Sequence, residues 1–468
     1  MLWTYWWELV CQLRSACGRR RTFLWMATCL AGMTTRTDLM GVTSIVRALG
    51  LLGVCYDRLL DFFHSSAVDL NTLTRVWRDV VFRAHGGLLR VGGRPVLVGD
   101  GIKVAKAGRK MPAVKNLHQS SESNTKPQHI FGHSCQAVAV LAQALSTVFA
   151  VPLTCRIHEG VVFSNRDHRT LLDKMILLID SLGMNEPFYF VADAYYATGK
   201  IVRGLLAKGN HLITRARSNS VAYFPAAPLS SSVRRRRGRP KKYGKKIKVA
   251  SLLADADRLE KATSPVYGEK DVTIQFTVAD LLWRPVGILV RFVVVDHPRR
   301  GTILLMSTDL NLPALEIIRI YGLRFKIEVS FKQSLRVIGA YAYHFWMATM
   351  TPLRRASGNQ YLHHTSDSYR QAVRRKIAAY HCHIQLGLIA QGLLQILAAT
   401  KPTLVWRSFG SWIRTVRPGM APSEQVAAIA MRNTLPEFLA ACAKAIIFTK
   451  FLRDRIDLSR AEGINLAA

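Results

Sequence analysis

Three acidic residues occupy positions from which they could bind divalent metal ions. Asp100 and Asp193 each follow a short apolar run typical of a β-strand, at 95–99 and 188–192, and Glu328 lies in a stretch with helical spacing. Carboxylate oxygens are ligands that Mg²⁺ prefers, and pairs of such ions are used to break phosphodiester bonds. We therefore interpret all three as catalytic, metal-binding residues, with Mg²⁺ or Mn²⁺ as the ion.

Each carboxylate also has an ordinary structural interpretation. Asp100 precedes Gly101, and an Asp-Gly pair after a strand is usually a turn. Asp193 could cap a following helix. Glu328 lies four residues after Arg324, so these two could form an ion pair on a solvated helix face. The metal-site interpretation gains weight because all three occur together in a strongly basic chain.

The third carboxylate is predicted to share one helical face with three other polar side chains. Tyr321, Arg324, Glu328 and Lys332 are spaced three, four and four residues apart, which on a continuous helix places them within roughly 80° of one another. Arg324 could clamp a phosphate with its planar guanidinium group, and Lys332 could add a point charge. Tyr321 could bond a phosphate or stack on a base. We therefore predict that these side chains contact DNA.

The charge of the chain indicates a polyanionic partner. The 468 residues include 65 Lys and Arg against 30 Asp and Glu, a formal net charge of +35. Such an excess favours nucleic acid as the partner, with an anionic membrane surface as the second possibility. The 49% content of hydrophobic residues indicates a globular protein rather than a disordered one.

The sequence argues against a membrane protein. The longest apolar stretches, at 137–153 and 386–399, are interrupted by polar residues and are shorter than the roughly 20 residues that a spanning helix needs. None of the eight cysteines forms a C-x-x-C pair. Scattered cysteines in a large basic chain indicate reduced thiols, so we expect a cytoplasmic protein without a membrane partner.

Hydrophobic periodicity divides the chain into five regions. Residues 1–88 are predicted to form short helices, which is equally compatible with a helical DNA-binding domain and with a helical cap on the core. Residues 89–215 alternate between strands and helices, as in a mixed α/β core. Residues 216–308 form a β-rich insertion, residues 309–400 complete the core with the helix of Glu328, and residues 401–468 are helical. The strands expected in the insertion are at 247–253, 271–278, 286–295 and 302–308.

The strongest charge cluster lies inside this insertion. Ten of the fifteen residues at 234–248 are Lys or Arg, and none is acidic. The Arg-Gly-Arg-Pro sequence that contains Arg237 and Arg239 resembles the core of an AT-hook, a slim extended segment suited to a narrow minor groove. A solvated loop with general phosphate affinity fits the same residues. Both interpretations predict that Arg237 and Arg239 bind DNA, and Lys103, beside Asp100, is a further candidate phosphate contact.

Four segments resemble bacterial insertion-sequence transposases of the DDE type, in the subgroup with a Tyr–Arg–Glu–Lys signature and a β-strand insertion. The segments are Gly99-Asp100-Gly101-Ile102-Lys103, Ile130-Phe131-Gly132-His133, Val191-Ala192-Asp193-Ala194-Tyr195-Tyr196, and residues 321–332. The resemblance implies an RNase H-like core in which Asp100, Asp193 and Glu328 bind the metal ions and Tyr321 and Arg324 contact the substrate. One position departs from the signature, because its lysine, seven residues after the glutamate, is Leu335 here.

The resemblance implies an enzyme that cuts double-stranded DNA at transposon ends and joins the freed ends to target DNA by strand transfer. It also implies a homodimer in the DNA complex. A metal-dependent nuclease of the same fold that does not join DNA is one alternative, and a catalytically dead DNA-binding relative is another. Retention of all three carboxylates argues against the dead relative, whereas Leu335 favours it. A protein that binds membrane surfaces is the alternative outside nucleic-acid chemistry.

Overall fold

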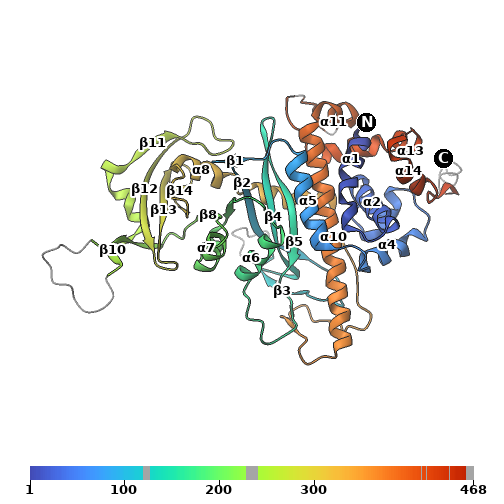
Figure 1. Ribbon diagram of the computed structural model, residues 1–468, viewed down its shortest axis with the longest axis horizontal. Helices are drawn as coiled ribbons and strands as arrows, with labels where there is room; N and C mark the ends of the chain where they lie inside the picture. Colours follow the sequence, from blue (N-terminus) through green and yellow to red (C-terminus); the bar gives the residue numbers. More distant parts are fainter. Residues whose placement is uncertain (120–126, 228–240, 413, 418, 442, 460–468) are drawn as a thin grey trace. The chain divides into compact units, whose positions relative to one another are not determined.

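The computed structural model describes residues 1–119, 127–227, 241–412, 414–417, 419–441 and 443–459 (Figure 1). The chain forms two compact units. Unit 1 comprises residues 1–89, 100–184 and 326–468, and unit 2 comprises residues 90–99 and 185–325. The chain therefore passes between the units more than once, and the boundary between residues 99 and 100 falls inside a single strand.

Unit 1 is built mainly of helices, with an antiparallel group of strands and a separate pair of short parallel strands. Its helices are α1 (Leu2–Cys11), η1 (Gln12–Ala16), α2 (Arg20–Thr35), α3 (Gly41–Ala48), α4 (Cys55–His64), α5 (Leu70–Ala84), α6 (Leu171–Ser181), α9 (Lys326–Gln333), the π-helical η5 (Ser334–Ile338), α10 (Asp367–Thr400), α11 (Pro402–Phe409), α12 (Glu424–Asn433), α13 (Leu435–Ala441), η6 (Ala443–Ala445) and α14 (Ile446–Arg453). Its strands are β3 (Lys115–His118), β4 (His129–Ala144), β5 (Thr147–Ile157), β6 (Val161–Val162), β15 (Gln360–Tyr361) and the second half of β2 (Arg94–Ala105).

Unit 2 contains most of the remaining strands. They are β1 (Arg90–Val91), the first half of β2, β7 (Tyr189–Ala192), β8 (His211–Arg215), β9 (Val221–Pro225), β10 (Tyr243–Lys248), β11 (Glu260–Thr263), β12 (Thr273–Trp283), β13 (Ile288–His297) and β14 (Gly301–Ser307). Its helices are η2 (Ala194–Tyr196), α7 (Gly199–Leu206), η3 (Val249–Ala254), η4 (Ala256–Arg258) and α8 (Ala314–Gly322).

The strand order identifies a mixed α/β core. In unit 2, β7 runs parallel to both β2 and β8. In unit 1, β4 pairs antiparallel with β5, and β2 is the neighbour of β4. The resulting order, β5-β4-β2-β7-β8, with parallel pairing confined to β2, β7 and β8, is the one expected of an RNase H-like core. The prediction of the fold class is therefore confirmed.

The predicted insertion contains a run of antiparallel strands, with β12, β13 and β14 paired along most of their lengths. Three of the four strands expected there occur, with boundaries shifted by a few residues. The strand predicted at 247–253 is wrong, because only its first two residues continue β10 and the rest form the 3₁₀ helix η3. The run Val-Ala-Ser-Leu-Leu-Ala has the apolar content of a strand, but only two of its residues, Val249 and Leu252, are buried, three positions apart.

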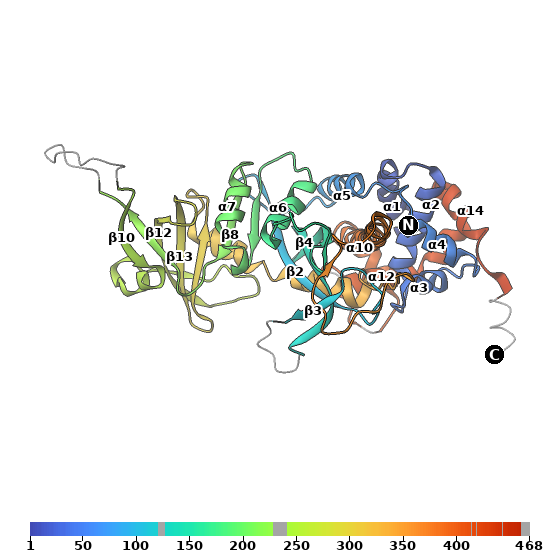
Figure 2. The same ribbon diagram turned by 90° about the horizontal axis from the view of Figure 1, so that it is seen from below.

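Helix α10 is the central helix of unit 1, and Figures 1 and 2 show it among the N-terminal helices and beside β5. It reaches β5 with polar side chains as well as apolar ones, since Gln385 Nε2 donates to the carbonyl oxygen of Leu153 at 2.8 Å. Its glycines allow close approach, because a Cβ on Gly392 would lie 2.3 Å from the Trp77 ring. The apolar stretch noted in the sequence at 386–399 lies within this helix.

Helix α10 is also the one described helix that is long and apolar enough to cross a membrane. Its most apolar 18-residue window is 94% buried inside the protein. Burial of this extent is typical of the core helix of a folded domain, whose apolar side chains contact other side chains. Packing against β5, α2 and α5 accounts for the apolar composition of α10.

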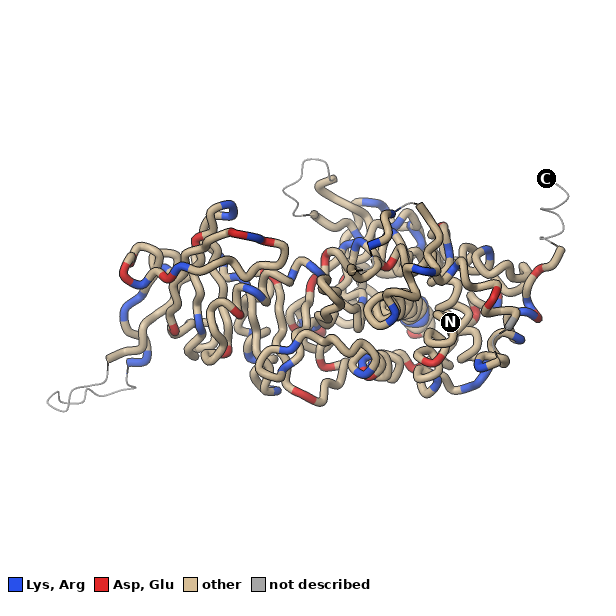
Figure 3. The backbone as a smooth tube through the Cα atoms, turned by 90° about the horizontal axis from the view of Figure 1, so that it is seen from above, with Lys and Arg blue, Asp and Glu red and all other residues tan. Residues whose placement is uncertain are grey.

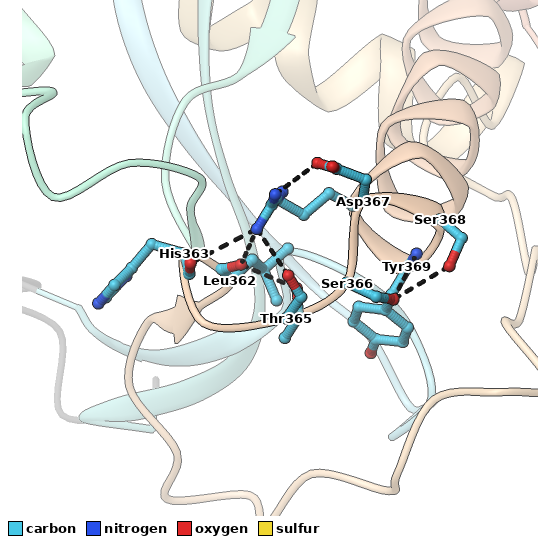
Figure 4. A network of polar contacts seen from close by, with 8 residues as sticks. Leu362, His363, Thr365, Ser366, Asp367, Ser368 and Tyr369 are labelled. Atoms are coloured by element: carbon cyan, nitrogen blue, oxygen red, sulfur yellow. Dashed lines mark hydrogen bonds and ion pairs between the residues drawn. The ribbon is translucent and has the colours of Figure 1, made fainter.

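A polar network fixes the start of α10 (Figure 4). Ser366 Oγ accepts the N–H of Tyr369 at 3.2 Å and so caps the helix. The guanidinium group of Arg370 turns back to donate to the carbonyl oxygen of Thr365 at 2.6 Å and also pairs with Asp367. These bonds satisfy groups at the helix end and hold the preceding loop against the first turn.

Candidate active site

Asp193 is held by backbone groups at the end of β7 in unit 2. The residue is half-buried and caps the short helix η2, and its Oδ1 accepts the N–H of Tyr195 at 3.1 Å. Its own carbonyl oxygen accepts a hydrogen bond from Thr214 Oγ1 on β8 at 2.8 Å. The capping role anticipated from the sequence is thus observed, and it fixes the carboxylate at the carboxyl end of a parallel strand, where α/β proteins place functional groups.

Tyr321 and Arg324 belong to the same unit as Asp193, and both charged groups affect the pKa of Tyr321. Burial is the main cause that raises the pKa of Tyr321; Arg324 and Arg215 act in the opposite direction, and the negative charge of Asp193 adds to the rise. Arg324 also forms a hydrogen bond with the Tyr321 side chain. Unit 2 therefore places a carboxylate and two guanidinium groups within electrostatic reach of the Tyr321 phenol.

Arg215 is a residue of this cluster that the sequence analysis missed. It is the last residue of β8, whose register pairs Thr214 with Ala192 on β7. Its place at the carboxyl end of a parallel strand is the signal that could have identified it. Guanidinium groups at such a position suit phosphate oxygens, which accept two parallel hydrogen bonds from the planar fork.

Asp100 and Lys103 lie on the half of β2 that belongs to unit 1. Asp100 is half-buried, and its Oδ1 accepts the N–H of the following residue, Gly101, at 2.7 Å. Lys103 is exposed, and its Nζ donates to the carbonyl oxygen of His118 on β3. The β-strand continues through Asp100, so the Asp-Gly pair does not form the tight turn that was its ordinary interpretation.

The predicted continuous helix over residues 321–332 is wrong. Helix α8 ends at Gly322, the residues 323–325 form a turn, and α9 begins at Lys326. At the end of α8 the N–H groups of Leu323 and Arg324 bond to carbonyls three residues back, which tightens the last turn. Tyr321 and Arg324 therefore belong to unit 2, and Glu328 and Lys332 to unit 1, so the four do not share one helical stripe.

Glu328 is exposed on α9, and this short helix is held in place by a buried glutamine of α10. Gln391 Nε2 donates to the carbonyl oxygen and to Oγ of Ser330, at 3.1 and 3.0 Å, and its Oε1 accepts from Ser334 Oγ. Ser330 and Ser334 face the core while Glu328 faces outward. Lys332 is exposed on the same helix, and Leu335 is 38% exposed on η5.

The pairing of β2 with β7 relates the positions of Asp100 and Asp193 on neighbouring strands. Val98 of β2 pairs in parallel with Val191 of β7, and each aspartate comes two residues after its member of this pair. Among the described residues, no group of three or more His, Cys, Asp and Glu side chains is assembled to hold a metal ion. Asp100 and Glu328 lie in unit 1 and Asp193 in unit 2. The donor chemistry of the three fits Mg²⁺, because all are carboxylates and each is at least partly exposed.

Only part of the basic segment at 234–248 lies within the described residues. Arg237 and Arg239 lie outside the described residues, whereas Lys241 and Lys242 are described and exposed. Figure 3 shows that Lys and Arg occur along the backbone of both units rather than in one segment. The excess of positive charge is thus a property of the whole chain.

Comparisons with known proteins place the chain in a family. No curated protein matches the sequence. A solved structure, a piggyBac transposase synaptic complex with hairpin DNA, is similar over 96% of this chain and 81% of that chain, with 10% sequence identity and a TM-score of 0.33. The model of the family described as "DDE superfamily endonuclease" matches residues 9–277, a range that contains Asp100 and Asp193 and ends before α8. The chain belongs to the DDE superfamily endonuclease family.

Proposed function

We propose that the protein is a DNA transposase that cuts double-stranded DNA at the ends of its element and joins the freed 3′-ends to target DNA. The observation that carries this proposal is the parallel pairing of β2 with β7. Val98 pairs with Val191, and Asp100 and Asp193 each follow two residues after their member of this pair. Family membership supports the nuclease half of the reaction. The excess of positive charge supports DNA as the substrate.

Asp100, Asp193 and Glu328 are the residues that would hold Mg²⁺ or Mn²⁺. When bound, the ions would act as Lewis acids that activate the attacking oxygen and stabilise the leaving oxygen. The proposal requires Glu328, which is exposed on α9, to hold the same ions as the two aspartates in the DNA complex.

Tyr321, Arg324 and Arg215 would bind the phosphates that flank the cut. A planar guanidinium group donates hydrogen bonds to a phosphate in fixed geometry, so the two such groups near Tyr321 would orient the scissile phosphate. Lys103 and Lys332, both exposed in unit 1, would contribute phosphate contacts that depend on salt concentration. Joining two ends in one event further requires two copies of the chain on the DNA.

DNA cleavage by matched variants tests the proposal. The substrate is duplex DNA that carries the element ends, incubated with Mg²⁺ and the wild type, Asp193→Asn or Asp255→Asn. Asp255 is an exposed aspartate of the same unit that pairs with Arg258, so its variant controls for the change of charge. We expect Asp193→Asn to lose cleavage by at least about a thousandfold and Asp255→Asn to cleave normally. Equal cleavage by both variants would refute the proposal.

The joining step needs its own measurement. Precut ends with free 3′-hydroxyl groups are offered with a supercoiled target plasmid, and joined products are counted. The transposase proposal predicts joined products that disappear in Asp193→Asn. Cleavage without joining would identify a nuclease, and DNA binding without either product would identify a catalytically dead relative.

A further inference from the structure

Unit 1 contains a cavity of about 660 Å³ that none of the proposed catalytic residues lines. It lies where the end of β5, the helix α6 and the middle of α10 come together, and its walls include Arg156, His158, Lys174, Leu178, Ile377 and His381. Cavities of 300–1,000 Å³ are the usual size of small-molecule sites. The charged groups that line this one indicate which ligand it suits.

Arg156 brings a positive charge to the cavity without a protein counterion. Its Nη1 donates to the carbonyl oxygen of Cys155 at 2.9 Å and to Gln385 Oε1 at 3.0 Å, and its Nη2 donates to Thr74 Oγ1 at 2.9 Å. All three acceptors are neutral, and among the described residues no carboxylate pairs with this side chain. Burial lowers the pKa of Arg156 to about 10, so the group is still charged at neutral pH. Two of its five N–H donors have no acceptor within the described part of the chain.

Lys174 brings a second positive charge from α6. No carboxylate within the described residues forms an ion pair with it. The two carboxylates that line the cavity already have partners, since Asp167 pairs with Arg169 at 2.7 Å and Glu159 pairs with Lys115 at 3.4 Å. Lys174 Nζ donates to the carbonyl oxygen of His158 at 2.6 Å, and the charges of Asp167 and Glu159 act on it from a distance. Arg156 and Lys174 are therefore the two cations lining the cavity that have no carboxylate ion-pair partner among the described residues.

The two histidines that line the cavity are uncharged, so they neither add to its positive charge nor offset it. His158 Nδ1 faces Gln136 Oε1 at 2.6 Å, and His381 Nε2 accepts the N–H of Ile157 at 3.0 Å. Burial, reinforced by the charge of Arg156, lowers the pKa of His158 to about 3 and that of His381 well below its usual value. Both rings are neutral at physiological pH, and His381 carries its proton on Nδ1.

We propose that this cavity binds the phosphate group of a nucleotide, with Arg156 and Lys174 as its two ligands. A buried charge without a partner is costly, and an anionic ligand would offset that cost. The planar guanidinium group and the ammonium group together match the oxygens of a phosphate monoester. Apolar walls that include Leu178 and Ile377 would cover the sugar and base, so the site suits a nucleotide better than inorganic phosphate.

Calorimetric titration of the full chain with thymidine 5′-monophosphate tests the proposal, with thymidine as the control ligand. We expect saturable binding of the monophosphate and at least tenfold weaker binding of thymidine, because the phosphate provides the charged contact. Saturable binding that is equal for both ligands, or absence of binding of the monophosphate at millimolar concentration, would overturn the proposal.

Matched variants assign the binding to this cavity. Lys174→Met should weaken binding of thymidine 5′-monophosphate at least tenfold, whereas Lys450→Met, the same change at an exposed lysine of α14, should leave it within twofold. Arg156→Lys keeps the buried charge but loses the planar fork, so it should weaken binding by a smaller factor. Equal affinities of Lys174→Met and Lys450→Met would overturn the assignment.

The phosphate could come from a free nucleotide or from the end of a DNA strand, and one comparison separates them. A 5′-phosphorylated single-stranded trinucleotide should compete with thymidine 5′-monophosphate if strand ends enter the cavity, and its 5′-hydroxyl counterpart should not. Failure of both to compete identifies a free nucleotide as the ligand. These measurements need no cleavage, so they succeed or fail independently of the proposed transposase activity.

Discussion

The two units hold their candidate carboxylates in different ways. Asp193 is held by its own neighbourhood, through a backbone cap and the strand pairing of β7. Glu328 is held indirectly, because α9 is fixed through Ser330 by Gln391, a residue 61 positions after Ser330 in the chain. The first arrangement depends on local backbone geometry, and the second on one side chain of α10.

This difference indicates which substitutions each side tolerates. Replacement of side chains around Asp193 should alter substrate contacts while the strand end stays in place. Replacement of Gln391 should loosen the helix that carries Glu328 without touching any group that contacts DNA. The predictions below test this contrast between direct contact in unit 2 and indirect support in unit 1.

The largest effect is expected on the unit 2 side. Arg324→Ala should lower the rate of DNA cleavage by about a hundredfold, because it removes a phosphate donor beside Asp193. Arg324→Lys should recover only part of that loss, since lysine keeps the charge but not the planar fork. Single-turnover cleavage measures both rates. Wild-type rates in Arg324→Ala would contradict a role for this residue in phosphate binding.

The next effect concerns the support of α9. Gln391→Leu should lower the free energy of unfolding by about 2 kcal/mol, because it removes the bonds to Ser330 and leaves the buried Ser334 hydroxyl without its acceptor. Gln371→Leu makes the same change at an exposed position of the same helix and should cost less than about 0.5 kcal/mol. Urea unfolding compares the two. Equal costs would show that the Gln391 network does not support the helix.

A buried lysine of unit 1, Lys106, should make the stability of the protein depend on pH. Lys106 packs over the Tyr343 ring, 3.6 Å from its centre, and donates to the Tyr343 carbonyl oxygen at 3.2 Å. Burial lowers the pKa of Lys106 from 10.5 to about 7, with the buried groups Cys135 and His133 also close enough to interact with it. Between these values the unfolded chain binds more protons than the folded one, so stability from this group rises with pH above about 7.

The variant Lys106→Met isolates this contribution. It should stabilise the protein most at pH 6 to 7 and progressively less as the pH rises toward 9, as measured by urea unfolding at each pH. Lys103→Met, at an exposed position of the preceding strand β2, should show no such trend. A stabilisation by Lys106→Met that is constant across this range would contradict the lowered pKa.

The smallest effect concerns the position where the signature lysine is replaced. Leu335→Lys should raise DNA affinity by a few fold and increase the salt dependence of binding by about one unit, because it adds one phosphate contact. The side chain is 38% exposed, so the substitution should be accommodated. Leu335→Gln adds polarity without charge and serves as the control. An unchanged salt dependence in Leu335→Lys would show that this position lies away from the DNA.

The sequence alone predicted those features that depend on residues close together along the chain. The strand that contains Asp100 and the strand that ends just before Asp193 both follow from short apolar runs. The break between α8 and α9 could not be predicted in this way. The period of apolar residues continues across residues 323–325, and the turn is defined by bonds from Leu323 and Arg324 to carbonyls three residues back.

The candidate site was predicted in part for the same reason. Tyr321 and Arg324 follow from a local signature, but Arg215 enters their neighbourhood only through the pairing of β8 with β7, a contact between distant segments. The support of α9 by Gln391 and the two cations of the unit 1 cavity likewise depend on tertiary packing. Neither the support of α9 nor the pair of cavity cations corresponds to a local pattern in the sequence.

The central claim is that Asp100, Asp193 and Glu328 together bind divalent ions on DNA. Its most direct test is the titration of Mn²⁺, followed by the electron paramagnetic resonance signal of the free ion, into the protein bound to a short duplex. The account predicts that Asp100→Asn, Asp193→Asn and Glu328→Gln each weaken Mn²⁺ binding at least tenfold while Asp255→Asn does not. Wild-type Mn²⁺ affinity in Glu328→Gln, or in either aspartate variant, would contradict it.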